Sequence, residues 1–290
     1  MASAFLAILI VVVLGHVLPE YTRLRDYGWF RAWLASAERS LGEQRLWRGG
    51  AGLLVSLGVP LLGVGLLQFL SRGQFYGLLT FLLGLVALYY AWGPRDLDLD
   101  AEAAAAAPEG EPRRAAFAAL AGHPADGHDA AVTAVMEAAL VRWFGTLFWF
   151  LLLGAIGAIG YRLVQLCART PEFEAALPPA QRELARRLAA LLDWPVAHLM
   201  TLALAVAADF DRVLHTWREW HAGERRDPLS TSFLASAALA LVRVAEEEEG
   251  SDGAGDALAS ALQQALALCW RVLIVWLVVL ALMVLAGFIG

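Results

Sequence analysis

The sequence predicts an all-α, polytopic helical membrane protein, and three observations lead to this fold class. The 290-residue chain is 59% hydrophobic and only 17% charged, which is too apolar for an ordinary soluble domain. Uncharged stretches recur that are long enough for a helix to cross about 30 Å of hydrocarbon. Backbone amides in hydrocarbon are satisfied only in helices or closed barrels, and the length of these stretches favours helices.

Five stretches are predicted to cross the bilayer within a single membrane domain, 1–290. They lie at about 1–19, 49–71, 73–94, 143–161 and 272–290. A sixth apolar run, 194–208, contains Pro195 and His198, and it fits a short re-entrant or interfacial helix as well as a crossing. The number of crossings, five or six, therefore stays open.

The connecting segments are assigned by their charge. Arginines and aromatic residues alternate through loop 20–48, which the positive-inside rule places in the cytoplasm as an interfacial amphipathic segment. Loop 95–142 must lie on the same side, because two crossings separate it from the first loop. An amphipathic helix is predicted over 169–192, and a solvated acidic loop over 246–256. The side of 163–271 stays open.

Composition excludes several kinds of chemistry. All 22 basic residues are arginine, so there is no Schiff-base lysine and no lysine under a nucleotide phosphate. The formal charge of −6 and the lack of a basic stripe exclude an obvious nucleic-acid site. Cys167 and Cys269 are too few for a disulfide framework or a metal site and are expected to be packing residues. No cofactor is predicted.

Three glycines mark the stretch 143–161 as a helix that packs closely. Gly154, Gly157 and Gly160 recur every third residue and fall on one helical face. A neighbouring backbone can approach such a face.

Two polar segments could supply ligands. His123, Asp126, His128 and Asp129 could bind a metal ion such as zinc, although their spacing matches no known signature, and a polar turn is the alternative. The segment of His215, Trp217, Trp220 and His221 could stack on a ligand or serve as an interfacial anchor. His198 lies in an apolar run, as a transporter would require, but the two halves of the chain do not repeat.

Glu137 is the carboxylate nearest the start of the glycine-containing stretch. A carboxylate at a membrane boundary can act as a base or bind a metal ion. It can equally pair with Arg142 or solvate the end of a helix, and both interpretations stay open.

Residues 147–163, LFWFLLLGAIGAIGYRL, include Phe148, Trp149, Tyr161 and Arg162 and resemble the signature of the AmpE family. Two further blocks are similar to that family: 191–194, with Asp193 and Trp194, and 208–217. The resemblance implies a multi-pass protein of the bacterial inner membrane. It also implies a regulatory role in cell-wall recycling and β-lactamase induction, with the lipid bilayer and an AmpD-type amidase or another recycling protein as partners.

The same stretch resembles the CobD/CbiB enzymes, which attach an aminopropanol group during cobalamin synthesis. Their polar block, aligned from Leu147, places its glutamate on Glu137 but two of its other polar residues on Ala138 and Val141. Its glycine falls on Arg142 and its proline on Thr146. Apolar side chains neither ligate metals nor transfer protons. The resemblance therefore implies a non-catalytic relative. The alternative is a membrane ligase of that type, or a hydrolase, that uses Glu137.

Overall fold

The computed structural model describes residues 2–17, 26–73, 77–92, 97–108, 110–122, 127–223, 227–249 and 254–287. Every regular element in these residues is a helix, which confirms the all-α prediction. The chain divides into two compact units. Unit 1 comprises Met1–Pro94 and Gly145–Leu192, and unit 2 comprises Arg95–Phe144 and Asp193–Ile289.

Four helical runs among the described residues are long and apolar enough to cross a membrane. They are Gly52–Leu70, His128–Leu153, Pro179–Ala207 and Leu258–Leu285. Shorter apolar helices occupy the first and third predicted spans, α1 (Ala2–Val17) and α5 (Leu78–Ala91). The 14 residues of α5 cover only about 21 Å at ~1.5 Å per residue. By length and composition, the described residues therefore contain four helices that could cross a membrane, and the number of crossings stays a prediction.

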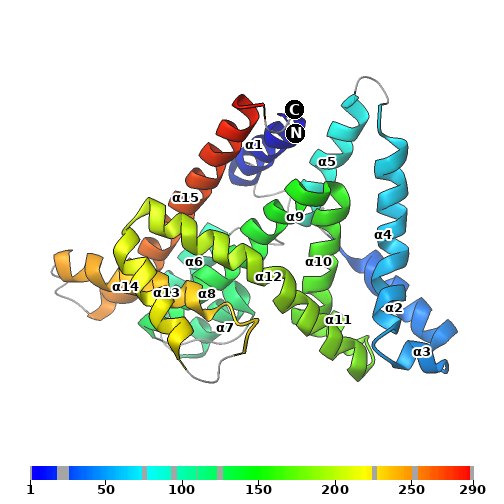
Figure 1. Ribbon diagram of the computed structural model, residues 1–290. Coiled ribbons are helices and arrows are strands. Elements are labelled where there is room, and N and C mark those ends of the chain that lie inside the picture. The colour runs from blue at the N-terminus through cyan, green and yellow to red at the C-terminus, as the bar shows by residue number, and fades with distance from the viewer. Residues whose placement is uncertain are drawn as a thin grey trace. The chain divides into compact units, whose positions relative to one another are not determined.

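Unit 1 is organised around α10 (Ala155–Arg169), which packs against α4 (Gly52–Leu70) and α5 (Figure 1). Helix α1 packs along α5. In the predicted amphipathic loop, α2 (Gly28–Leu41) buries Phe30, Leu34 and Ala37 on one face, which is the spacing of an amphipathic helix. The other helices of the unit are α3 (Arg45–Arg48), α9 (Gly145–Leu153), α11 (Pro171–Ala175) and the first half of α12 (Pro179–Ala207).

Unit 2 is organised around α8 (His128–Ala139), and Figure 1 shows the helices that surround it. Its neighbours are α6 (Leu97–Ala106), α7 (Glu111–Ala121), α14 (Ser232–Glu249) and α15 (Ala254–Leu285). Helix α13 (Phe210–Ala222) packs on α14. Almost every α8 residue between Ala131 and Ala139 is buried, as expected of a helix with neighbours on several sides.

The predicted span 143–161 is not one helix, because the chain leaves helical geometry at Gly154. Its φ of +69° and ψ of −143° are readily adopted only by glycine. Before this residue, the π-helical turn η3 (Leu140–Phe144) and α9 continue the run that starts at His128. After it, α10 begins at Ala155. The continuous apolar helix is therefore 128–153, displaced toward the N-terminus from the predicted span.

Two other predicted boundaries differ. The run 194–208 is not a separate short helix, because it forms the second half of α12, a 29-residue helix that contains Pro195. Glutamate favours helix, and Glu246–Glu249 end α14 instead of forming a loop. Residues 254–256 already belong to α15, which also starts well before the predicted span 272–290.

Candidate functional site

Arg142 is a buried cation in unit 2, in the π-helical turn η3 that follows α8. Only 7% of the residue is exposed. Its Nη1 donates to Asp100 Oδ2 at 2.7 Å, and its Nη2 donates to the carbonyl oxygens of Ala119 at 2.8 Å and Leu120 at 2.6 Å. The two carbonyls belong to the last turn of α7, where helical carbonyls lack intrahelical partners. Arg142 thus joins α6 and α7 to η3.

The carboxylate that bonds Arg142 was not singled out by the sequence analysis. Asp100 comes from α6, and only 4% of it is exposed. Glu137 is half-buried on α8, before η3 begins. A sequence signal for Asp100 does exist. In the acidic, alanine-rich helix α6, Asp100 shares one helical face with the apolar residues Leu97, Ala101 and Ala104.

In unit 1, the amide of Gln68 bridges the break between α9 and α10. Its Nε2 donates to the Leu153 carbonyl at 3.1 Å, and its Oε1 accepts from the Ile156 amide at 3.1 Å. A break exposes both kinds of backbone group, and each costs several kcal/mol when it is unsatisfied in hydrocarbon. An amide side chain carries a donor and an acceptor, so one residue can satisfy both.

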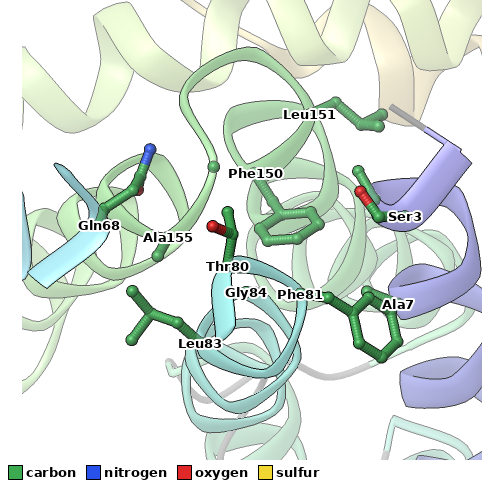
Figure 2. Close-up of a pocket in the computed structure, with 12 residues that line it drawn as sticks. Ser3, Ala7, Gln68, Thr80, Phe81, Leu83, Gly84, Phe150, Leu151 and Ala155 are labelled. Atoms are coloured by element: carbon green, nitrogen blue, oxygen red, sulfur yellow. The ribbon is translucent and has the colours of Figure 1, made fainter. Parts of the chain in front are cut away.

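A cavity of about 130 Å³ lies beside this break. Figure 2 shows its lining, which comes from α1, α4, α5, α9 and α10 and is mostly apolar. Ser3, Gln68 and Thr80 supply the polar side chains, and Thr80 Oγ1 donates to the Ser71 carbonyl at 2.8 Å. Small-molecule sites usually exceed about 300 Å³, so this volume suits only a small group.

The predicted packing glycines have different roles. A Cβ on Gly157 would collide with the carbonyl oxygen of Trp149, whereas a Cβ on Gly160 would lie 3.3 Å from Leu61 Cδ2. Gly154 instead supplies the positive φ of the break, next to Gln68. The glycine periodicity therefore marks one backbone break and two close approaches.

The signature residues are packing residues in the structure. Tyr161 is buried, and its hydroxyl lies where a Cβ on Gly145 would be. The Phe148 and Trp149 rings lie 5.1 Å apart, and Trp149 Nε1 donates to the Leu192 carbonyl at 3.2 Å. Arg162 and Asp193 are also buried.

In unit 2, three helices bring an aromatic–imidazole cluster together, which we define as Trp194, His198, Trp217, Trp220, His221 and Phe233. The His198 ring lies 4.2 Å from Trp194, 4.4 Å from Phe233 and 6.0 Å from His221. Trp217 and His221 are 4.1 Å apart. Only the α13 members are neighbours in the sequence, because α12 and α14 contribute the others through tertiary contact.

Both histidines of the cluster have an assigned tautomer. His198 Nδ1 lies 2.9 Å from the Trp194 carbonyl, and His221 Nδ1 lies 2.8 Å from the Trp217 carbonyl. A carbonyl only accepts, so this network assigns the proton to Nδ1 in each ring. In the neutral imidazole, Nε2 is then a hydrogen-bond acceptor.

A groove of about 220 Å³ adjoins the cluster, between α12 and α13. One wall is His198, Thr201, Leu202 and Ala205, and the other is Phe210, Val213, Leu214 and Trp217. Each wall follows the i, i+3, i+4, i+7 spacing of a single helical face. The groove therefore runs between one face of α12 and one face of α13, and the His198 imidazole is part of its lining.

The predicted metal ligands do not assemble in the part of the chain that the structure describes. There, no group of three or more His, Cys, Asp or Glu side chains could hold a metal ion. His123 and Asp126 lie outside the described residues. Asp129 lies 3.2 Å from His128 Nδ1 and accepts from Arg243 at 2.6 Å. His215 Nδ1 lies 3.4 Å from a Glu219 carboxylate oxygen.

The two cysteines are free and buried, as expected of packing residues. Burial raises the pKa of the Cys167 thiol to about 12, so the reactive thiolate is scarce at neutral pH.

Comparison with known proteins adds no relative to this picture. No protein-family model, curated protein or solved structure matches the chain.

Proposed function

We propose that this chain is a multi-pass protein of the bacterial inner membrane that acts by binding rather than catalysis, as a modulator linked to cell-wall recycling and β-lactamase induction. The proposal starts from the resemblance of 147–163, 191–194 and 208–217 to the AmpE family. Four candidate spans support the membrane location.

The hydrogen bonds that Arg142 makes within the protein favour a binding protein over an enzyme. This position carries glycine in the CobD/CbiB block, and here it carries a guanidinium that bonds Asp100 and two carbonyls. Ala138 and Thr146, at two further positions of the block, are buried. Three protein oxygens hold the guanidinium of Arg142, which favours a structural role for this position.

An arginine-rich surface in unit 1, which also exposes Glu38 and Glu43 and on which Arg31 pairs with Glu172 at 3.2 Å, supports partner binding. Arg31, Arg39, Arg45 and Arg48 are exposed on α2 and α3, and Leu46 is exposed beside them. Arginine and an exposed apolar side chain together are typical of a protein interface or of a surface that meets anionic lipid. An AmpD-type amidase or another recycling protein is the partner that the resemblance implies.

The decisive experiment is deletion of the gene in its native bacterium, followed by measurement of β-lactamase activity after exposure to a β-lactam. We expect altered induction that is restored by the wild-type gene and not by an Arg39→Glu/Arg45→Glu double variant. Arg218→Glu, an exposed charge reversal in unit 2, is the matched control and should restore induction. Unchanged induction in the deletion strain would refute the regulatory role.

An enzyme that uses Glu137 is the second candidate, because this half-buried carboxylate precedes a π-helical turn, a feature common at functional sites. Purified protein should be assayed on cobamide and muropeptide precursors. A turnover that Glu137→Gln abolishes would replace the binding proposal.

A further inference from the structure

We propose that the groove between α12 and α13 binds the hydrocarbon chain of a single-chain amphiphile, with Nε2 of His198 accepting a hydrogen bond from a hydroxyl or ammonium group of the ligand. The inference rests on the membrane location in the proposed function. It does not depend on the regulatory role.

The size and lining of the groove suit a hydrocarbon chain. Leu202, Ala205, Phe210, Val213 and Leu214 make most of its lining apolar. Its volume of about 220 Å³ exceeds the ~150 Å³ of an apolar protein cavity that holds benzene. It is smaller than the ~300 Å³ of a typical drug-sized site, so it fits one narrow chain rather than a bulky ligand.

The groove continues into a surface that faces hydrocarbon if α12 crosses the membrane. Leu202 lines the groove and is also 57% exposed, and the neighbouring Val206 is 65% exposed on the same helix. Helix α12 is one of the four candidate spans. A chain could therefore enter from the bilayer without passing through water, which identifies an amphiphile of the membrane as the occupant.

Apolar contact alone would not select a ligand here. Lipid tails are as apolar as leucine, so moving a chain from bilayer into the groove brings little hydrophobic gain. Selection must come from the polar atoms of the lining. Thr201 Oγ1 donates to the Ala197 carbonyl at 2.9 Å and can still accept, as Nε2 of His198 can, whereas the indole N–H of Trp217 donates. A ligand group that donates, above all a hydroxyl that also accepts, matches this lining best, and His198 is its ring acceptor.

The tautomer of His198 specifies the chemistry of the head group. With Nδ1 directed to the Trp194 carbonyl, the neutral ring offers Nε2 as an acceptor. A hydroxyl or an ammonium can donate to it, whereas an ionised sulfate or carboxylate can only accept. Trp217 also lines the groove, and an indole face attracts a cationic ammonium.

Photolabelling of the purified full chain in nanodiscs tests the inference. The two probes carry the same diazirine-bearing acyl or alkyl chain, one as a monoacylglycerol and the other as an alkyl sulfate. We expect the monoacylglycerol to label peptides from 198–217 about tenfold more than the sulfate, which corresponds to about 1.4 kcal/mol. Equal labelling by the two probes would overturn the role of His198.

Filling the groove is the second arm of the test. Ala205→Phe places a ring in the groove and should reduce labelling of 198–217 by about tenfold. Val206→Phe adds the same ring on the exposed side of α12 and should leave labelling unchanged. If Ala205→Phe does not fold, Leu214→Trp fills the groove from α13. Labelling that survives a folded groove-filling variant would overturn the inference.

The His198→Phe variant tests recognition of the ligand's head group separately from binding of its hydrocarbon chain. This variant keeps an aromatic ring but removes Nε2, so both probes should label the groove equally and weakly.

A cross-link between two copies of this segment, instead of a lipid adduct, would show that a second chain occupies the groove and would also overturn the inference. If the wild-type chain shows no labelling selectivity while β-lactamase induction depends on the gene, this inference alone is refuted. If the wild-type chain is selective but deletion leaves induction unchanged, only the regulatory role is refuted.

Discussion

Polar bridges, at Gln68 and Gln181 in unit 1 and at the Asp100–Arg142 pair in unit 2, join helices with different chemistry, although unit 1 also buries the guanidinium of Arg162. Unit 1 uses neutral amides: Gln68 bridges the helix break, and Gln181 donates to the Trp47 carbonyl at 2.6 Å and accepts from Ser56 Oγ at 3.1 Å. Unit 2 uses the Asp100–Arg142 ion pair. A neutral hydrogen bond contributes about 1 kcal/mol net, whereas removing one member of a buried ion pair costs about 3–5 kcal/mol.

This difference indicates which helix contacts depend on charged groups. Gln68 and Gln181 cannot ionise, so unit 1 holds its helices together at these two sites in the same way at any pH. In unit 2, the guanidinium of Arg142 needs a carboxylate, and two imidazoles lie in one aromatic–imidazole cluster. Four experiments can break or sharpen this comparison.

Removal of the carboxylate in unit 2 should have the largest effect. Asp100→Ala leaves the buried guanidinium of Arg142 without its counter-charge, and we expect a loss of about 3–5 kcal/mol in the free energy of unfolding. Equilibrium unfolding in mild detergent measures it. Asp100→Ala/Arg142→Met should recover part of the loss, because both charges are then absent. A loss below about 1 kcal/mol would show that the pair is not a stabilising centre.

Removal of the amide at the helix break should have the next largest effect. Gln68→Leu leaves the Leu153 carbonyl and the Ile156 amide unsatisfied, at about 1–3 kcal/mol in total because the site is only partly buried. The same unfolding experiment measures it. Gln264→Leu is the matched control, because the buried Gln264 Oε1 has no hydrogen-bond partner among the described residues and its removal should cost less. Equal losses in the two variants would argue against the bridging role.

Glycine substitution in α10 tests the close packing of unit 1 without changing any polar group. In Gly157→Ala, the added methyl would collide with a backbone oxygen, and we expect a loss of about 1–3 kcal/mol. In Gly160→Ala, the nearest atom is the movable end of Leu61 at 3.3 Å, so the loss should be smaller. Thermal unfolding of both variants ranks their stabilities. A larger loss in Gly160→Ala would contradict the close approach of Gly157 to the Trp149 carbonyl oxygen.

The smallest effect is a pH dependence at the start of α13. The Arg212 backbone amide donates to Asp209 at 3.0 Å and lowers the pKa of that carboxyl. Because the folded pKa is depressed, the stabilisation is complete above the unfolded pKa of about 3.9 and is lost as the pH falls through the folded value. Hydrogen exchange of the α13 amides should therefore accelerate, relative to intrinsic rates, below about pH 4.

Asp209→Asn is the control for this pH dependence. Asparagine also caps helices but does not ionise, so the acid-dependent change should disappear while the helix remains. An identical acid response in the variant would assign the effect to another group.

Local sequence patterns predicted the helices better than their boundaries. The helical spacing of apolar residues in α2 and the uninterrupted apolar run of α4 could be predicted, because both depend only on residues close together in the sequence. The break at Gly154 was not, since a glycine in an apolar run is compatible with a continuous helix until Gln68 supplies its two hydrogen bonds. The candidate site divides in the same way: the sequence grouped the α13 members of the aromatic–imidazole cluster, but it did not group them with the members on α12 and α14.

The sequence by itself determined that the chain is helical, apolar and rich in hydrocarbon-length segments, because length, composition and periodicity are local properties. Only the tertiary structure decided which polar groups meet. Asp100 and Arg142 are 42 residues apart, and Gln68 and Leu153 are 85 residues apart. The energy of such pairs depends on distance and burial in three dimensions, which spacing along the chain does not specify.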